Sequence, residues 1–254
     1  MSPSAPDYVE GHGLLAGRAV LVTAAAGSGI GFAVAKRCLE EGARVVISDA
    51  HERRLGEAAA ELGVPGIVCD VTNEEHVQAL FAGALDALGG LDVLINNAGL
   101  GGTAEVVSMT DEQWSKVIDV TLTGTFRCTR AALAHMQPQG HGVIVNNASV
   151  LGWRAQAGQA HYAAAKAGVM ALTRCSAIEA APYGVRINAV SPSIAMHANL
   201  ARVTSDELLE ELTSREAFGR AAEPWEVANV MVFLASDYSS YMTGEVVSVS
   251  SQRA

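Results

Sequence analysis

The chain has 254 residues, a formal net charge of −10 and an isoelectric point near 5.1, and half of its residues are hydrophobic. This length fits a single α/β domain around one sheet, and an aromatic content of only 5% suits small side chains packed between helices and buried strands. The acidic surface would repel a phosphate backbone, which argues against nucleic acid as a partner.

The cysteines and the first residues of the chain exclude further classes of protein. Cys38, Cys69, Cys128 and Cys175 stand far apart, without a C-x-x-C pair or a histidine cluster, so we expect free thiols and no metal. Residues 1–16 form an N-terminal extension that lacks the basic start and apolar stretch of a signal peptide. Because no later segment reaches the ~18 consecutive apolar residues of a membrane span, we expect a soluble, cytoplasmic protein.

Short β-branched runs alternate with longer Ala-rich segments of helical character from Arg18 onward. This alternation predicts one domain over 17–254, a Rossmann-type doubly wound parallel sheet of about seven strands with helices on both faces. Ligands should then bind beyond the carboxyl ends of the strands. The expected strands are Ala19–Thr23, Arg44–Ser48, Gly66–Cys69, Val93–Asn96, Gly142–Asn147, Arg186–Val190 and Glu245–Val249.

One interval, from Ser193 to Pro224, lacks a convincing strand. Within it, Ser205-Asp206-Glu207 followed by two leucines predicts a short capped helix. We interpret residues 193–224 as a lid over the substrate.

A glycine-rich turn follows the first expected strand, in the order Thr23-Ala-Ala-Ala-Gly27-Ser28-Gly29-Ile30-Gly31. Glycines at this junction let backbone amides and the N-terminus of the next helix face a pyrophosphate. The spacing is not G-x-G-x-x-G, because Phe32 stands three residues after Gly29. Ordinary turns also use glycine, so the turn alone is weak evidence for phosphate binding.

Asp49 directly follows the second expected strand, about twenty residues past the glycines. A carboxylate there could accept hydrogen bonds from a ribose 2′-hydroxyl and would repel a 2′-phosphate, which favours NAD. Arg53 and Arg54 follow closely and leave NADP possible. The alternative role for Asp49 is the N-cap of the next helix.

Tyr162 and Lys166 stand four residues apart in an Ala-rich helical segment, so they share one face of the helix. A nearby ammonium stabilises a phenolate, so Lys166 should lower the pKa of Tyr162 towards the range useful for proton transfer. Such a pair is common by chance on helix surfaces. Ser149 supports a catalytic role, because it lies at the carboxyl end of the fifth expected strand.

Together, the glycine-rich turn, Ser149 and the Y-x-x-x-K pair resemble the short-chain dehydrogenase/reductase family over nearly the whole chain. The resemblance implies hydride transfer between a nicotinamide cofactor and a carbonyl or secondary alcohol. It assigns Ser149 to polarise the substrate oxygen, Tyr162 to donate the proton and Lys166 to hold the nicotinamide ribose. Its implied cofactor contacts are Thr23, Gly27, Ser28, Gly29, Ile30, Gly31, Asp49, Asp70, Val71, Asn97, Ala98, Gly99, Tyr162, Lys166, Pro192, Ser193 and Ile194.

The chain departs from this family at several of these positions. Thr121 occupies the place of an Asn that holds a water in the family's proton relay, so Thr121 is the expected fourth catalytic residue. The turn carries one extra residue and has Ala24 where Gly is usual. Ser193 replaces a Gly, and His197 replaces a Thr that commonly binds the carboxamide; His197 is either an exposed loop residue or a group that faces the ligand.

Within the family, Gln159–Gly168 and Gly219–Pro224 resemble 3-oxoacyl-thioester reductases most. The turn and the segment Ser-Pro-Ser-Ile-Ala are similar to actinobacterial members of sterol-ring catabolism, a branch of lipid metabolism, whose substrates are alicyclic hydroxy or keto acyl-CoA thioesters. An acidic acyl carrier protein is disfavoured as a partner unless Arg127, Arg130 or Arg154 forms a basic patch. NAD favours alcohol oxidation, because cells usually keep that pool oxidised.

Two other functions stay open. One is a 3-oxoacyl-(acyl-carrier-protein) reductase that uses NADPH. The other is an inactive cofactor-binding sensor or structural subunit, against which the intact Ser149, Tyr162 and Lys166 argue. The resemblance implies a homotetramer, and the apolar segment around Val169, Met170 and Leu172 with Leu122 and Phe126 predicts self-association.

Overall fold

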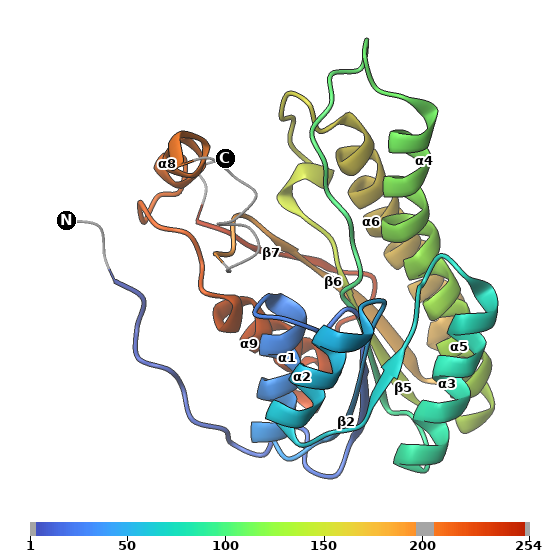
Figure 1. Ribbon diagram of the computed structural model, residues 1–254. Helices are drawn as coiled ribbons and strands as arrows, with labels where there is room; N and C mark the ends of the chain where they lie inside the picture. Colours follow the sequence, from blue (N-terminus) through green and yellow to red (C-terminus); the bar gives the residue numbers. More distant parts are fainter. Residues whose placement is uncertain (1–3, 197–205, 252–254) are drawn as a thin grey trace.

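The computed structural model describes residues 4–196 and 206–251. In these ranges, seven parallel strands form one sheet in the order β3-β2-β1-β4-β5-β6-β7, with helices on both faces (Figure 1). The strand order reverses between β1 and β4, the point where ligands of such sheets bind. The predicted Rossmann-type doubly wound fold is confirmed. The strands are β1 Ala19–Val22, β2 Arg44–Asp49, β3 Gly66–Val68, β4 Val93–Asn96, β5 Gly142–Asn147, β6 Val185–Pro192 and β7 Val246–Val249.

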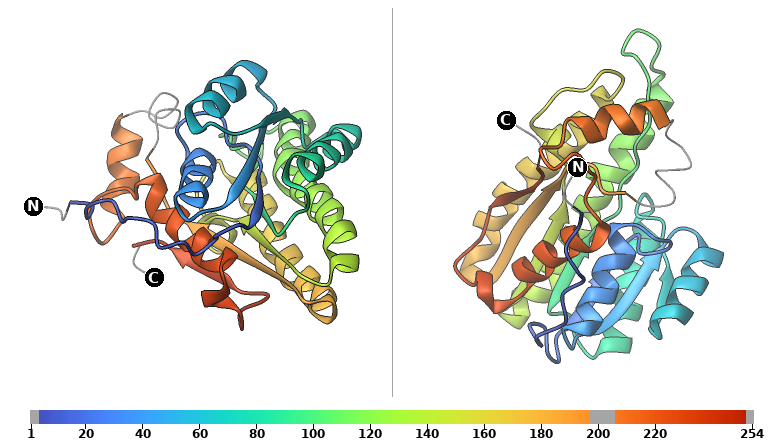
Figure 2. Two further views of the ribbon diagram at one scale, coloured as in Figure 1. Left: turned by 90° about the horizontal axis from the view of Figure 1, so that it is seen from below. Right: turned by 90° about the vertical axis from the view of Figure 1, so that its left-hand side faces the viewer.

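The helices divide between the two faces of the sheet, as the views of Figure 2 show. One hydrophobic cluster packs α1, α2 and α9 against the sheet, and a second packs α3, α5 and α6 against the other face. Both faces of the parallel sheet are therefore buried, which explains its nearly continuous apolar strands. The helices are α1 Ile30–Glu40, α2 Glu52–Leu62, α3 Glu74–Leu88, α4 Asp111–Ile118, α5 Gly124–Gln139, α6 Ala160–Ala180, α8 Asp206–Ser214 and α9 Pro224–Ala235.

Local signals fix where the helices begin and end. The side chain of Asn73 accepts from two backbone amides at the start of α3, and Gly89 ends that helix in the left-handed conformation. Thr110 and Gln113 form a capping box at the start of α4. The caps at Asn73 and Thr110 follow the carboxyl ends of β3 and β4, whereas Gly89 leads into the start of β4.

The predicted strands agree with the observed ones to within one or two residues. The largest difference is β6, which runs on to Pro192 and so extends further towards the ligand edge. The predicted short helix between 193 and 224 is α8, although Ser205 and His197 lie outside the described residues. At its base, Ala195 and Ala222 form a single parallel bridge.

Part of the expected self-association surface is interior. Val169 and Met170 are 1% and 2% exposed, in a small cluster against the sheet. Phe126 on α5 is instead 41% exposed and Ile178 on α6 is 77% exposed. The prediction that Val169 and Met170 promote self-association is therefore wrong, because they pack against their own sheet.

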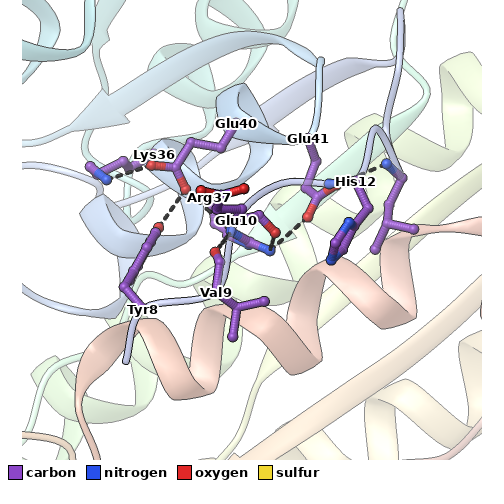
Figure 3. Close-up of polar contacts among 9 residues, drawn as sticks. Tyr8, Val9, Glu10, His12, Lys36, Arg37, Glu40 and Glu41 are labelled. Atoms are coloured by element: carbon purple, nitrogen blue, oxygen red, sulfur yellow. Dashed lines mark hydrogen bonds and ion pairs between the residues drawn. The ribbon is translucent and has the colours of Figure 1, made fainter. Parts of the chain in front are cut away.

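The N-terminal extension lies along α1 and α9, as Figure 3 shows in close-up. The guanidinium of Arg37 donates to Val9 O at 2.5 Å, and the carboxylate of Glu41 accepts from the backbone of His12 at 2.8 Å. The ring of Tyr8 meets Trp225 of α9 edge to face, with ring centres 5.4 Å apart. The extension thus contacts both helices, which also pack directly against each other.

No helix in the described ranges is long and apolar enough to cross a membrane. Among the described residues, no group of three or more His, Cys, Asp or Glu side chains could hold a metal ion. Cys38, Cys69 and Cys128 are buried free thiols, and Cys175 is an exposed one.

Candidate active site

Ser149 lies two residues after the end of β5, at the carboxyl edge of the sheet. Its hydroxyl accepts a hydrogen bond from the backbone of Leu151 at 3.2 Å and caps a short 3-10 turn over Val150–Gly152. Only 9% of the residue is exposed. The structure therefore places Ser149 at the edge that the sequence predicts.

Tyr162 and Lys166 lie one turn apart near the start of α6, which carries both to the same edge. The Lys166 Nζ lies 5.5 Å from the centre of the Tyr162 ring, which confirms the shared helix face. Burial raises the pKa of the Tyr162 hydroxyl, and a hydrogen bond with Ser149 has a smaller, lowering effect. Ser149 and Tyr162 are thus joined directly.

The expectation that Lys166 lowers the pKa of Tyr162 is wrong. Burial dominates, so that pKa is raised, and Ser149 is the group that opposes the rise. The Lys166 ammonium donates to the backbone oxygen of Asn147 at 2.5 Å. Lys166 is itself 2% exposed, and burial lowers its pKa to about 8. The charge that was expected to act on Tyr162 is therefore lost as the pH rises above about 8.

Thr121 lies in a π-helical turn, Asp119–Thr123, that joins α4 to α5. Such turns are frequent at functional sites. The residue is fully buried, and its hydroxyl accepts from the backbone of Leu100 at 3.0 Å and donates to the Leu100 oxygen at 3.3 Å. Gly99 packs between Thr121 and Lys166: a Cβ there would lie 3.9 Å from Thr121 Cγ2 and 3.3 Å from Lys166 Nζ. The methyl group of Thr121 thus faces Gly99, which also contacts Lys166, and its hydroxyl is bound to Leu100.

The glycine-rich turn between β1 and α1 contains a strained residue. Ala24 has a φ of +52°, a left-handed conformation that glycine adopts more easily. The start of α1 has no capping side chain, because its N-cap is Gly29. Its first amides are free to meet an anionic group such as a pyrophosphate, and nothing lies within 4 Å of the position a Cβ on Gly27 would occupy.

Two carboxylates border this turn. Asp49 at the end of β2 accepts from Ala26 N at 3.2 Å and from His51 N at 2.9 Å. The N-cap of α2 is His51, so the alternative role of Asp49 as that N-cap is wrong. Asp70 accepts from both the backbone and the hydroxyl of Thr72; its pKa is lowered by these bonds although burial, the largest single effect, raises it. Asp70 thereby closes a turn beside the buried Val71.

Hydrogen bonds join Thr23, at the end of β1, to the turn after β4, at the centre of the carboxyl edge of the sheet. The Thr23 hydroxyl accepts from the backbone amides of Asn97 at 3.0 Å and Ala98 at 3.2 Å. Pro192 ends β6, and Ser193 and Ile194 follow it at the same edge, where the backbone amide of Ser193 donates to Val249 O at 3.2 Å.

The structure adds one residue that sequence reasoning missed. The Asn147 side chain donates to the Asn97 Oδ1 at 2.9 Å. The only sequence signal is an asparagine in the last place of an apolar strand, on the opposite face from Asn146.

Comparisons with known proteins identify the family to which the chain belongs. A family model described as enoyl-(acyl carrier protein) reductase matches residues 24–251. The chain therefore belongs to the short-chain dehydrogenase/reductase family, and it is an oxidoreductase.

Three relatives illustrate its place in that family. A Mycobacterium tuberculosis protein named (5R,7aS)-5-hydroxy-7a-methyl-1-oxo-2,3,5,6,7,7a-hexahydro-1H-indene-carboxyl-CoA reductase is 66% identical, over 98% of this chain and 97% of its own. The solved structure of a short chain dehydrogenase from Mycobacterium smegmatis is 62% identical, covers 99% of both chains and has a TM-score of 0.89. A 3-oxoacyl-(acyl-carrier-protein) reductase of Thermotoga maritima is 38% identical, over 92% of this chain and 97% of its own.

Proposed function

We propose that this protein moves a hydride between NAD(H) and a secondary alcohol or ketone on an alicyclic, sterol-derived acyl-CoA thioester. The observation that carries the proposal is the Ser149–Tyr162–Lys166 group at the carboxyl edge of the sheet. The substrate class follows from the name of the 66% identical relative. Reduction is the direction which that name gives, and the same residues would support the reverse reaction.

The roles of the side chains follow from their atoms. When bound, the nicotinamide supplies or accepts the hydride. The Tyr162 hydroxyl would donate its proton to the substrate oxygen during reduction and take it back during oxidation. The Ser149 hydroxyl would donate a hydrogen bond to the same oxygen, and the Lys166 ammonium would hold the ribose hydroxyls. Thr121 acts indirectly, by fixing the backbone at Leu100.

NAD is proposed over NADP because of the charges beside the turn. The Asp49 carboxylate ends β2 next to the amide of Ala26, where a 2′-phosphate would meet its negative charge. Arg53 is 81% exposed at its side chain and pairs with Glu57 at 2.6 Å, along α2. Because Arg53 pairs with Glu57, its charge does not offset that of Asp49.

A carrier-protein substrate is the second candidate, raised by the name of the Thermotoga relative. Such a partner is acidic and would need a basic patch on this acidic chain. Arg127 pairs with Asp119 at 2.8 Å, and Arg130 pairs with Glu74 at 2.6 Å. Because acidic neighbours neutralise both arginines, the coenzyme A thioester is preferred.

We also propose a homotetramer in the cytoplasm. The exposed Phe126 of α5 and Ile178 of α6 would be covered by other copies. Free thiols, including the exposed Cys175, fit a reducing compartment.

Residues 193–224 with α8 are proposed as the substrate lid, because this interval follows the ligand end of β6.

The test measures kcat/KM with NAD(H) and NADP(H), in both directions, on three thioesters: an alicyclic keto acyl-CoA, a straight-chain 3-oxoacyl-CoA and the same acyl group on acyl carrier protein. We expect the highest value for the alicyclic thioester with NAD(H), and loss of turnover in Tyr162→Phe. A higher value for the carrier protein with NADPH would replace the proposal by the second candidate. Binding of NAD without turnover of any thioester would favour an inactive sensor.

A further inference from the structure

Three hydrogen bonds form a continuous path from the glycine-rich turn to Lys166. The Asn97 Nδ2 donates to Ala24 O at 2.9 Å, in the strained part of the turn. The Asn147 Nδ2 donates to Asn97 Oδ1 at 2.9 Å, and Lys166 Nζ donates to Asn147 O at 2.5 Å. The path crosses the ends of β1, β4 and β5 and finishes on α6.

The chemistry of the end groups fixes the orientation of both amides. A backbone oxygen only accepts, so Asn97 must turn its nitrogen to Ala24 and its oxygen to Asn147. Asn147 must then turn its nitrogen to Asn97. Its own Oδ1 is left buried without a hydrogen-bond partner among the described residues. A leucine would avoid that unpaired oxygen, so stability alone does not explain an asparagine at this position.

Close packing holds the Asn97 end of the path. A Cβ on Gly31 would lie 2.4 Å from Asn97 Nδ2 and 2.3 Å from Ala24 O, so glycine is needed for this contact. The backbone N–H of Asn97 also donates to Thr23 Oγ1 at 3.0 Å. A displacement of the turn at Ala24 would therefore move Asn97, and through it Asn147.

We infer that Asn147 is a positioning residue that links the dinucleotide-binding turn to Lys166, so that the turn and the lysine are held in register. The inference rests on the proposed function, because it takes the turn as the cofactor site. The side chain of Asn147 holds the turn through Asn97, and its backbone oxygen holds the ammonium of Lys166. Neither contact involves Ser149 or Tyr162.

The neighbouring residue supplies a matched control. Asn146 faces the other side of β5, where its Oδ1 accepts from Asn96 at 2.9 Å and its Nδ2 donates to Thr173 Oγ1 at 2.9 Å. This second network is also buried, but contains neither Lys166 nor a residue of the turn. Thr173→Val removes the bond from Asn146 and the bond that the Thr173 hydroxyl donates to Val169 O at 2.8 Å, with almost no change in volume.

The experiment compares Asn147→Leu and the smaller Asn147→Ala with Thr173→Val in the full chain. We measure the Kd for NAD by calorimetry, the melting temperature, and kcat and KM across pH. For both Asn147 variants we expect a Kd for NAD about tenfold higher, a lower kcat and a shifted alkaline limb of the kcat profile, with the KM for the thioester unchanged. Thr173→Val should lower the melting temperature and leave the Kd for NAD as it is.

The outcomes separate two kinds of failure. If Asn147→Leu and Asn147→Ala bind NAD as the unchanged protein does and lose only melting temperature, the asparagine is structural and the inference is overturned. If the unchanged protein itself does not bind NAD, the proposed function fails first. A double variant with Asn97→Ala tests the link directly: one connected path predicts that Asn147→Ala adds little once Asn97 is gone.

Discussion

The ammonium nitrogen of Lys166 lies 5.5 Å from the centre of the Tyr162 ring and donates to a backbone oxygen. Burial lowers the pKa of Lys166 to about 8, whereas an unfolded lysine titrates near ~10.4. Between these values the unfolded chain binds more protons than the folded one, so this group makes stability rise with pH in that window. Below pH 8 the buried charge opposes folding in full.

Lys166→Met should therefore raise the melting temperature at pH 7 while it abolishes turnover. The gain should shrink as the pH rises from 8 towards 10, because the unchanged protein then buries a neutral amine. The control is Lys36→Met on the surface of α1, where a hydrogen bond with Glu40 raises the pKa of Lys36. Thermal unfolding across pH measures both, and a Lys166→Met variant less stable than the unchanged protein at pH 7 would contradict the prediction.

Ala24→Gly should stabilise the fold, because Ala24 has a φ of +52° and glycine adopts that conformation without steric cost. The expected gain is up to about 1 kcal/mol, reduced by the extra freedom of glycine in the unfolded chain. The matched control is Ala25→Gly, next in the turn and fully buried, which should destabilise. Chemical denaturation measures the two changes; a gain from Ala25→Gly or a loss from Ala24→Gly would count against the strain at Ala24.

Much of the fold could be predicted from sequence because parallel strands are buried on both faces. The apolar runs ending at Asn96 and Asn147 were therefore recognisable, and their last residues had to meet at one edge. The helical spacing of Tyr162 and Lys166 predicted their shared face in the same way.

The rest of the site depends on packing that no local pattern records. Asn97 and Asn147 are 50 positions apart and meet because β4 and β5 are neighbours in the sheet. The pKa of Tyr162 depends on every group that covers its ring, so no local pattern indicates that burial outweighs Lys166. The docking of the N-terminal extension requires α1 and α9, which lie far apart in the chain.

Gly31→Ala should prevent NAD binding, since its Cβ would lie 2.3 Å from Ala24 O and 2.4 Å from Asn97 Nδ2. The turn would have to open, so we expect the Kd for NAD to rise more than tenfold, a loss of over ~1.4 kcal/mol in binding. Gly56→Ala in α2, where a Cβ meets nothing within 4 Å, should instead stabilise by about 0.5–1 kcal/mol. Calorimetric titration measures the Kd for NAD of both variants, and denaturant titration measures their stability. Unchanged NAD binding by Gly31→Ala would contradict the assignment of this turn as the cofactor site.

Two ion pairs with the same spacing on α1 should differ sharply in their contribution to stability. Arg37 and Glu41 are 2.8 Å apart with side chains 5% and 0% exposed, beneath the N-terminal extension (Figure 3). Lys36 and Glu40 are 2.5 Å apart, but their side chains are 48% and 30% exposed. A buried carboxylate that loses its partner is costly, whereas an exposed pair is screened by water.

Arg37→Met should therefore lower the free energy of unfolding by about 3 kcal/mol, and Lys36→Met by about 0.5 kcal/mol or less. Arg37→Met also removes the donors to Val9 O and Glu10 O, so the extension should become accessible to proteases ahead of the rest of the domain. Denaturant titration measures the two free energies of unfolding, and limited proteolysis measures how fast the N-terminal extension is cleaved. Equal losses in both variants, with the extension still protected in Arg37→Met, would mean that the Arg37–Glu41 pair does not anchor it, and that the contact of Tyr8 with Trp225 holds it instead.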